Sequence, residues 1–521
     1  MSAPLLMVQG TASSVGKSVV AAGLCRILRR RGLRVAPFKA QNMSLNAAVT
    51  LDGGEIGRST AVQAAAAGVE PTVDMNPVLL KPEAERRSQL IVRGKVTGTF
   101  SAREYFGGKV DLWPVVAGAL DRLRDEYDIV VAEGAGSPAE MNLRDRDIAN
   151  MRVALHARAA VLLVGDIDRG GVFAQLLGTL DLLPPGERAL VRGLIVNRFR
   201  GDPALFADGV RFLEQRAGLP VLGVVPMVHD LGLAEEDGAV LDDTRRSPSD
   251  RTPPPDLRVA VVRLPRIANF DDFGPLERED GVSVDYVDRP DRLAGADLII
   301  LPGSKTTIAD LAFVRERGID AAIAAARGRG TPIMGICGGY QMLGREIRDP
   351  HQVESPVVTA PGLGLLPHET VFGREKRTCR VRGRLAAATG PFTASQGCEI
   401  DAYEIHAGRT FPVGEVAAAP IRLTSRSGVP IDEPDGAISD DGLLFGTYLH
   451  GLFENEAVRR SLLAWLGARS GTKSSTCPKG GCANSTASDP YERWADALEA
   501  TLDIDRLLVS CSVPTSRRHR S

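Results

Sequence analysis

Short apolar runs alternate with segments of helical periodicity along most of this chain. In the first half the runs cover residues 5–8, 34–38, 128–132, 160–165 and 193–196, and in the second half 258–262, 282–287, 296–301 and 332–336. Strands that are apolar throughout and separated by helices are typical of parallel sheets covered on both faces. We therefore expect an α/β protein with two doubly wound α/β domains.

A stretch rich in proline, serine and arginine separates the two halves. Residues 244–256 (TRRSPSDRTPPPD) have no apolar period and indicate an extended linker. We expect a first domain over residues 1–243 and a second over 257–508, which a helix over 489–508 closes. The remaining segments are a flexible insertion at 470–489 and a disordered tail at 509–521.

The composition excludes several classes of protein. Hydrophobic residues make up 44% of the 521 residues, and 63 basic residues nearly balance 65 acidic ones, so nothing favours nucleic-acid or membrane-surface binding. No apolar run approaches the length of a membrane span, and the N-terminus lacks the basic region of a signal peptide. The seven cysteines are scattered, and the pair Cys477 and Cys482 falls short of the four ligands of a structural zinc site. We expect a cytoplasmic protein.

A glycine-rich loop follows the first strand and precedes a helical segment. It has the sequence GTASSVGKS, in which five residues separate Gly10 from Gly16, whereas the common P-loop has four. Backbone N–H groups and the helix dipole can bind phosphate there, Lys17 can reach the terminal phosphates, and Ser18 can ligate Mg²⁺. The pattern predicts a nucleotide site of a variant P-loop class.

Polar residues close four other strands of the first half. They are Lys39, Glu133, Asp166 and Asn197. Ligands of open parallel sheets bind beyond the carboxyl ends of the strands, so these residues are candidates for a site next to the nucleotide.

This half resembles dethiobiotin synthetase and the ATP-dependent cobyrinate amidases. The resemblance implies that ATP phosphates bind at Gly10, Gly16, Lys17 and Ser18. It also implies that Glu133, in the EGAG motif, holds Mg²⁺ together with Ser18, and that Asn197 faces the adenine. A further Mg²⁺ ligand is either Asp52 or Glu55, and the sequence does not choose between them.

Three stretches narrow the resemblance to the cobyric acid synthase branch of that family. They are FKAQNMSLN at 38–46, EGAGSPAEMNLRDRDIANM at 133–151 and DIDRGGVFA at 166–174. Their many amide, acidic and arginine side chains suit a substrate that carries several carboxylates. Lys39 and Asp166 are therefore candidates for contact with a corrinoid substrate or for supporting such contacts.

The second half contains a thiol at a tight turn. In TPIMGICGGYQMLG, residues 331–344, an apolar strand reaches Cys337 and then two glycines and a helical segment. A cysteine at a helix N-terminus is favoured as the reactive thiolate. This domain resembles the class I glutamine amidotransferases, which implies that Cys337 is the nucleophile. It also implies an oxyanion hole from the backbone N–H groups of Gly303 and Gly338, each worth roughly 3–4 kcal/mol.

A thiol nucleophile needs a partner that takes its proton. His450 follows an apolar strand in GTYLHGLF, as the general base of the resembled family does, and it is our candidate. His406, with Glu404 on a predicted strand, is instead a candidate for substrate binding or support. Most class I amidotransferases carry His-x-Glu, but position 452 is Leu, a loss that the cobyrinate amidase branch shares. Glu404, Glu454 or a backbone carbonyl could orient His450.

Together the two resemblances imply one reaction. ATP and Mg²⁺ would activate a carboxylate as an acyl phosphate, and L-glutamine would supply ammonia to form a primary amide. The substrate implied is (adenosyl)cobyrinic acid a,c-diamide, amidated at its b, d, e and g carboxylates. The alternatives are a cobyrinic acid a,c-diamide synthase, or a P-loop ATPase switch with an inactive amidotransferase appendage. The sequence does not fix the oligomeric state.

Overall fold

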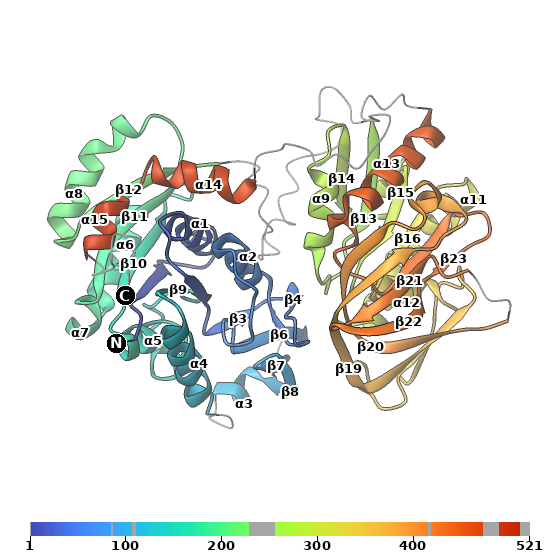
Figure 1. The fold of residues 1–521 in the computed structure, drawn as a ribbon, viewed down its shortest axis with the longest axis horizontal. Helices are drawn as coiled ribbons and strands as arrows, with labels where there is room; N and C mark the ends of the chain where they lie inside the picture. Colours follow the sequence, from blue (N-terminus) through green and yellow to red (C-terminus); the bar gives the residue numbers. More distant parts are fainter. Residues whose placement is uncertain are drawn as a thin grey trace. The chain divides into compact units, whose positions relative to one another are not determined.

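The computed structural model describes residues 2–84, 87–106, 111–228, 256–414, 418–471 and 489–510. The chain forms two compact units, shown in Figure 1. The first unit comprises Met1–Ser44, Glu55–Asp237 and Thr486–Ser521, and the second comprises Leu45–Gly54 and Gly238–Ser485. Cys477, Cys482, the tail from residue 511 and all but the last residue of the predicted linker lie outside the described residues.

The first unit is built on a parallel sheet of six strands in the order β12-β11-β10-β1-β9-β2 (Figure 1). Its strands are β1 (Leu5–Gly10), β2 (Val35–Phe38), β9 (Ile129–Glu133), β10 (Ala160–Asp166), β11 (Val191–Phe199) and β12 (Val221–Pro226). Its larger helices are α1 (Lys17–Arg30), α2 (Arg58–Ala67), α4 (Trp113–Glu126), α5 (Met151–Ala157), α6 (Val172–Leu182) and α8 (Ala207–Ala217).

Alternation along the central strand explains why this sheet is covered on both faces. Leu5 and Met7 of β1 belong to one buried apolar core, which also includes residues of α4, α5 and α6. Leu6 and Val8 belong to a second core, with residues of α1. Because successive side chains of a strand point to opposite faces, an uninterrupted apolar strand must have helices on both sides. The predicted doubly wound architecture is confirmed for this unit.

A smaller sheet of the first unit has the strand order β3-β6-β7-β8. Its strands are β3 (Gln41–Met43), β6 (Val78–Ala84), β7 (Arg87–Val92) and β8 (Lys95–Ser101), and α3 (Ala102–Phe106) follows the last of them. The unit also contains the short elements β5 (Glu55–Gly57) and α7 (Pro185–Arg188).

The C-terminal helical segment differs from the sequence-based prediction. Instead of one helix that closes the second domain, it forms α14 (Pro490–Glu499) and α15 (Ile504–Ser510), which belong to the first unit. The Trp494 indole N–H donates to the carbonyl oxygen of Val19 at 2.7 Å, and the Trp494 side chain is buried in the core beside α1. An apolar face on α14 thus covers an apolar face of α1. The position of α14 after the second unit in the sequence did not indicate this contact.

The second unit is built on a six-stranded sheet in the order β14-β13-β15-β16-β24-β23, in which only β23 is antiparallel (Figure 1). Its strands are β13 (Leu257–Val262), β14 (Val282–Val287), β15 (Leu298–Leu301), β16 (Ile333–Ile336), β23 (Ala437–Ile438) and β24 (Leu444–Thr447). Its helices are α9 (Gly274–Glu277), α10 (Thr307–Glu316), α11 (Ile319–Gly328), α12 (Gly338–Leu343) and α13 (Glu456–Ser470).

A second sheet in this unit is largely antiparallel. It contains β17 (Glu346–Arg348), β18 (Thr359–Pro361), β19 (His368–Leu385), β20 (Glu399–Pro412), β21 (Ile421–Arg426) and β22 (Val429–Asp435). The long strands β19 and β20 pair with each other, and β20 carries Glu404 and His406, as the predicted strand at YEIHAG requires. The short strand β4 (Ala47–Val49) also belongs to this unit.

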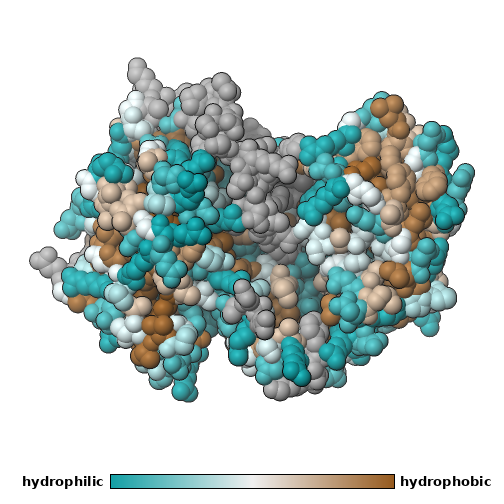
Figure 2. Space-filling model, turned by 180° about the vertical axis from the view of Figure 1, so that it is seen from behind, coloured by the Kyte–Doolittle hydropathy of each residue, from teal (hydrophilic) through white to brown (hydrophobic). Residues whose placement is uncertain are grey.

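The surface of the protein mixes polar and apolar residues. In the view of Figure 2, hydrophobic residues are interspersed with hydrophilic ones. Within the described residues, no helix has both the length and the apolar character needed to cross a membrane.

Candidate functional site

Cys337 lies at the sharp turn between β16 and α12. Its backbone adopts φ 51° and ψ −108°, a conformation that residues with a side chain rarely adopt, and its N–H donates to the Thr447 carbonyl oxygen at 2.8 Å. A Cβ atom at Gly339 would lie 1.9 Å from the Leu301 carbonyl oxygen, so only glycine fits there. The turn thus places a buried thiol at the carboxyl end of a central strand in a strained conformation.

His450 lies next to this thiol and is oriented by an aspartate. The nearby Cys337 side chain is one of the groups that raise the pKa of its imidazole. Its Nδ1 lies 2.6 Å from Oδ2 of Asp272, and the other carboxylate oxygen of Asp272 accepts from the Gly451 N–H at 2.8 Å. An ionised carboxylate only accepts hydrogen bonds, so His450 must carry a proton on Nδ1.

The electrostatic surroundings favour the charged form of His450. Burial alone would lower the pKa of its imidazole, but the charge and hydrogen bond of Asp272, together with Cys337, outweigh burial and raise it to about 10. The ring of Tyr403 stacks on the imidazole with 5.4 Å between the ring centroids. The arrangement can accept a proton from the thiol and hold it as an imidazolium.

The two carboxylates that sequence reasoning offered for orienting His450 lie elsewhere. Glu404 accepts from Nε of Arg426 at 3.1 Å, and Glu454 lies 4.0 Å from a guanidinium nitrogen of Arg278. Those predictions were wrong. Asp272 belongs to the 3₁₀ helix Phe270–Phe273, far from His450 in the sequence and outside any motif, so only the fold reveals it.

The two glycines predicted for the oxyanion hole, Gly303 after β15 and Gly338 after Cys337, lie close to each other's turns. A Cβ atom at Gly303 would lie 3.0 Å from Cε1 of His450, and one at Gly338 would lie 2.9 Å from the backbone nitrogen of Ser304. The Ser304 hydroxyl donates to Asp310 at 2.6 Å, and burial raises the pKa of that carboxyl to about 6 against the lowering effect of this hydrogen bond. The turn after β15 is thus fixed beside Cys337 and His450.

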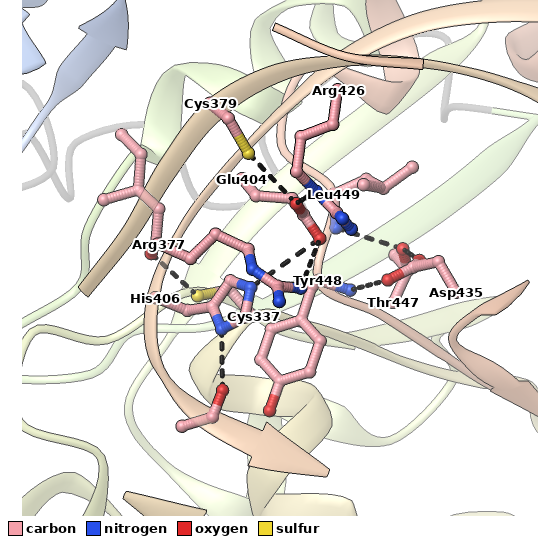
Figure 3. A network of polar contacts seen from close by, with 12 residues as sticks. Cys337, Arg377, Cys379, Glu404, His406, Arg426, Asp435, Thr447, Tyr448 and Leu449 are labelled. Carbon is pink, nitrogen blue, oxygen red and sulfur yellow. Dashed lines mark hydrogen bonds and ion pairs between the residues drawn. The ribbon is translucent and has the colours of Figure 1, made fainter. Parts of the chain in front are cut away.

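Glu404 and His406 form part of a buried polar network near Cys337 (Figure 3). Nδ1 of His406 donates to the Gly408 carbonyl oxygen at 2.7 Å, and its ring stacks on Tyr448 with centroids 3.9 Å apart. Burial alone would raise the pKa of Glu404, but His406 and Arg426 outweigh it and lower this pKa to about 2. The Cys337 thiol lies 3.5 Å from the carbonyl oxygen of Ile405, between these two residues on β20.

The predicted phosphate loop of the first unit has the expected form. It connects β1 to α1, and Gly16 immediately before α1 has φ 93°, which favours glycine. The Lys17 ammonium donates to the carbonyl oxygens of Ala12 at 2.8 Å and Gly136 at 3.0 Å, so it lies across the loop. The Asn197 amide donates to the carbonyl oxygen of Val15 at 2.8 Å and closes the loop from β11.

Glu133 gathers several polar side chains around the start of α1. Its Oε1 accepts from the Ser18 hydroxyl at 2.7 Å and lies 3.0 Å from the Lys39 ammonium. Its Oε2 accepts from the Gln63 amide at 2.5 Å. Predicted residues Ser18, Lys39 and Glu133 therefore come together, and Gln63 joins them without having been predicted.

The remaining candidates of the first half have other partners. Glu55 is buried in an ion pair with Lys81 at 2.6 Å, and Asp52 accepts from the Thr50 hydroxyl within the second unit. Asp166 lies at the end of β10, where it accepts from Arg198 at 3.0 Å. Among the described residues there is no group of three or more His, Cys, Asp or Glu side chains that could hold a metal ion by itself.

Comparisons with known proteins assign both halves. Residues 6–241 match the CobQ/CobB/MinD/ParA nucleotide binding domain, and residues 258–458 match the CobB/CobQ-like glutamine amidotransferase domain. A solved structure, PurLQS from Thermotoga maritima, covers 40% of this chain and 99% of its own at 24% identity, with a TM-score of 0.32, too low to carry an argument.

The similarity to full-length relatives is extensive. The chain is 53% identical to "Cobyric acid synthase" of Chloroflexus aurantiacus, covering 98% of this chain and 100% of the relative. It is also 53% identical to "Cobyric acid synthase" of Sorangium cellulosum, covering 98% and 99%. With two matched domains in the same order and relatives matched over nearly their full length, the chain belongs to the cobyric acid synthase family.

Proposed function

We propose that this protein uses ATP, Mg²⁺ and L-glutamine to amidate the b, d, e and g carboxylates of (adenosyl)cobyrinic acid a,c-diamide, which gives cobyric acid. As a member of its family the protein is a glutamine-dependent ligase that amidates cobyrinic acid carboxylates in cobalamin biosynthesis. The observation that carries the proposal is the presence of two sites. The second unit has the group of Cys337, His450 and Asp272, and the first unit has the predicted phosphate loop.

The glutaminase half of the reaction follows from the geometry around Cys337. His450 carries a proton on Nδ1 and donates it in a hydrogen bond to Asp272. Nε2 can therefore take the thiol proton while sulfur attacks the side-chain amide carbon of glutamine. The developing oxyanion would receive hydrogen bonds from the backbone N–H groups of Gly303 and Gly338. The imidazolium then protonates the leaving nitrogen, which departs as ammonia, and water hydrolyses the thioester to release glutamate.

The ligase half depends on the residues around the phosphate loop. The Gly10–Gly16 loop and the start of α1 would bind the ATP phosphates, and Lys17 would turn from its carbonyl partners to the terminal phosphates. Ser18 and Glu133 offer a hydroxyl and a carboxylate in direct contact, a pair of oxygen donors that suits Mg²⁺ with its remaining waters. Bound there, Mg²⁺ would neutralise charge on the phosphates during transfer.

The carboxylates of the corrinoid substrate are proposed to bind beside the charged residues that follow the strands of the first unit. Lys39 and Asp166 are proposed to contact the corrinoid or to hold groups that do, because Lys39 directly follows β2 and Asp166 ends β10 of the nucleotide-binding sheet. Phosphorylation of a carboxylate turns a poor electrophile into an acyl phosphate, and attack by ammonia releases phosphate and leaves a primary amide.

The test supplies cobyrinic acid a,c-diamide, ATP, Mg²⁺ and glutamine labelled with ¹⁵N in its side-chain amide. Mass spectrometry should find a product with four labelled nitrogens, and the Lys17→Ala variant should make none while it still hydrolyses glutamine. With unamidated cobyrinic acid as the substrate in a parallel reaction, labelling at the a and c positions only would support the a,c-diamide synthase alternative. Glutamine and ATP turnover without any amidated corrinoid would refute the proposal.

A further inference from the structure

Gln63 is buried in the first unit beside the residues proposed to hold Mg²⁺. It lies on α2, and its side chain has no exposed surface. Its amide nitrogen lies 2.5 Å from Oε2 of Glu133 and 3.4 Å from the backbone carbonyl oxygen of Ser18. Both of these atoms are acceptors, so the amide must present its NH₂ group to them.

This orientation leaves the other end of the amide unpaired. Within the described part of the chain, Gln63 Oε1 is fully buried and has no hydrogen-bond partner. An unpaired buried acceptor costs free energy, and such atoms are rare in folded proteins. On a side chain that contacts Glu133 and Ser18, such an acceptor can be satisfied by a water molecule bound to a metal ion held by those residues, and Mg²⁺ usually keeps several such waters.

The same contact limits how Glu133 can bind a metal. Gln63 donates to Oε2, whereas Oε1 faces the Ser18 hydroxyl, the other oxygen proposed to bind the metal, so Oε1 is the carboxylate oxygen on the side of the proposed site. In the structure Lys39 neutralises this oxygen at 3.0 Å. A group that holds one oxygen of a ligating carboxylate fixes the orientation of that ligand.

We propose that Gln63 is the positioning residue of the metal site: it holds Glu133 for coordination through Oε1 and accepts a hydrogen bond from a metal-bound water. The inference rests on the proposed function, because it concerns the Mg²⁺ ion of the same nucleotide site. The sequence offered Asp52 or Glu55 as a further ligand and did not point to Gln63, whose carboxamide contacts Glu133.

The test compares metal affinity in three variants of the full-length protein. Gln63→Leu removes the amide, and Gln63→Asn keeps an amide but withdraws it by one methylene. Thr60→Val is the matched control, because Thr60 lies one turn away on α2, is equally buried, and has a hydroxyl with no hydrogen-bond partner among the residues that the structure describes. Electron paramagnetic resonance of Mn²⁺, which prefers the same oxygen ligands as Mg²⁺, measures binding with a non-hydrolysable ATP analogue.

Both Gln63 variants should bind Mn²⁺ roughly 10- to 100-fold more weakly than the wild type, with thermal unfolding and glutamine hydrolysis preserved. They should also need correspondingly more Mg²⁺ for ammonia-dependent amidation. Mn²⁺ affinity within a factor of two of the wild type in both variants would overturn the role of Gln63 alone. A wild-type protein whose Mn²⁺ binding does not respond to the nucleotide would overturn the proposed metal site and this inference with it.

Discussion

Replacing Asp272 by asparagine should abolish most glutamine hydrolysis, for a reason set by two hydrogen bonds. In the wild type one carboxylate oxygen accepts from the Gly451 N–H at 2.8 Å and the other faces His450 Nδ1 at 2.6 Å. In Asp272→Asn the amide has a single acceptor. If its oxygen remains on Gly451, its NH₂ group faces Nδ1 and forces the imidazole proton onto Nε2.

That tautomer cannot take the proton of Cys337. Loss of the orienting carboxylate in this way lowers turnover by about 10³- to 10⁴-fold in catalytic machinery of this kind. Electrostatics acts in the same direction. Burial alone would lower the pKa of His450, but Asp272, together with Cys337, raises it from 6.5 to about 10. At about 1.4 kcal/mol for each pKa unit, this shift corresponds to several kcal/mol of stabilisation of the imidazolium.

The assay measures glutamate release at saturating glutamine. Glu454→Gln is the control, because Glu454 is half-exposed and lies near Arg278 instead of orienting His450. Amidation with ammonium in place of glutamine should remain at the wild-type level in both variants. Nuclear magnetic resonance of the labelled imidazole should show that His450 loses its proton at a lower pH in Asp272→Asn. A loss of glutaminase turnover smaller than tenfold would refute the reasoning.

Two further predictions concern stability. Asp435 is buried, and burial raises its pKa to about 7, against hydrogen bonds from Thr447 and Tyr448. A carboxyl with a raised folded-state pKa contributes stability that is fully present below its unfolded-state pKa of about 4 and is lost as the pH rises through 7. Asp435→Asn should therefore raise the denaturant midpoint of the second unit at pH 8.5 but not at pH 4; an equal change at both pH values would contradict this. Trp494→Ala should destabilise the first unit by about 3–5 kcal/mol, because it removes a buried side chain and its hydrogen bond to Val19; scanning calorimetry should show one transition moved down while glutaminase activity persists, and an unchanged transition would contradict the packing.

The sequence predicted what depends on local pattern. Apolar runs such as residues 160–165 became central strands because a segment apolar on both faces has few other stable environments. The positions of Cys337 and Ser18 followed from loops whose glycines are needed for backbone conformation and close approach.

What the sequence did not reveal depends on distant segments meeting. Asp272 and Gln63 carry no motif, and each becomes informative only when the fold brings it to His450 or Glu133. The C-terminal helix α14 follows the second unit in sequence, yet its apolar face is complementary to α1 of the first. Helical periodicity identifies such a face but does not identify its partner.

The central claim is that Cys337 releases ammonia from glutamine for a ligase site that can also use free ammonia. The most direct test assays Cys337→Ala for amidation of cobyrinic acid a,c-diamide with glutamine, and then with ammonium at mildly alkaline pH. We predict that the variant loses amidation with glutamine and keeps ATP-dependent amidation with ammonium at the wild-type rate. Retained use of glutamine, or the loss of both nitrogen sources in a correctly folded variant, would contradict the account.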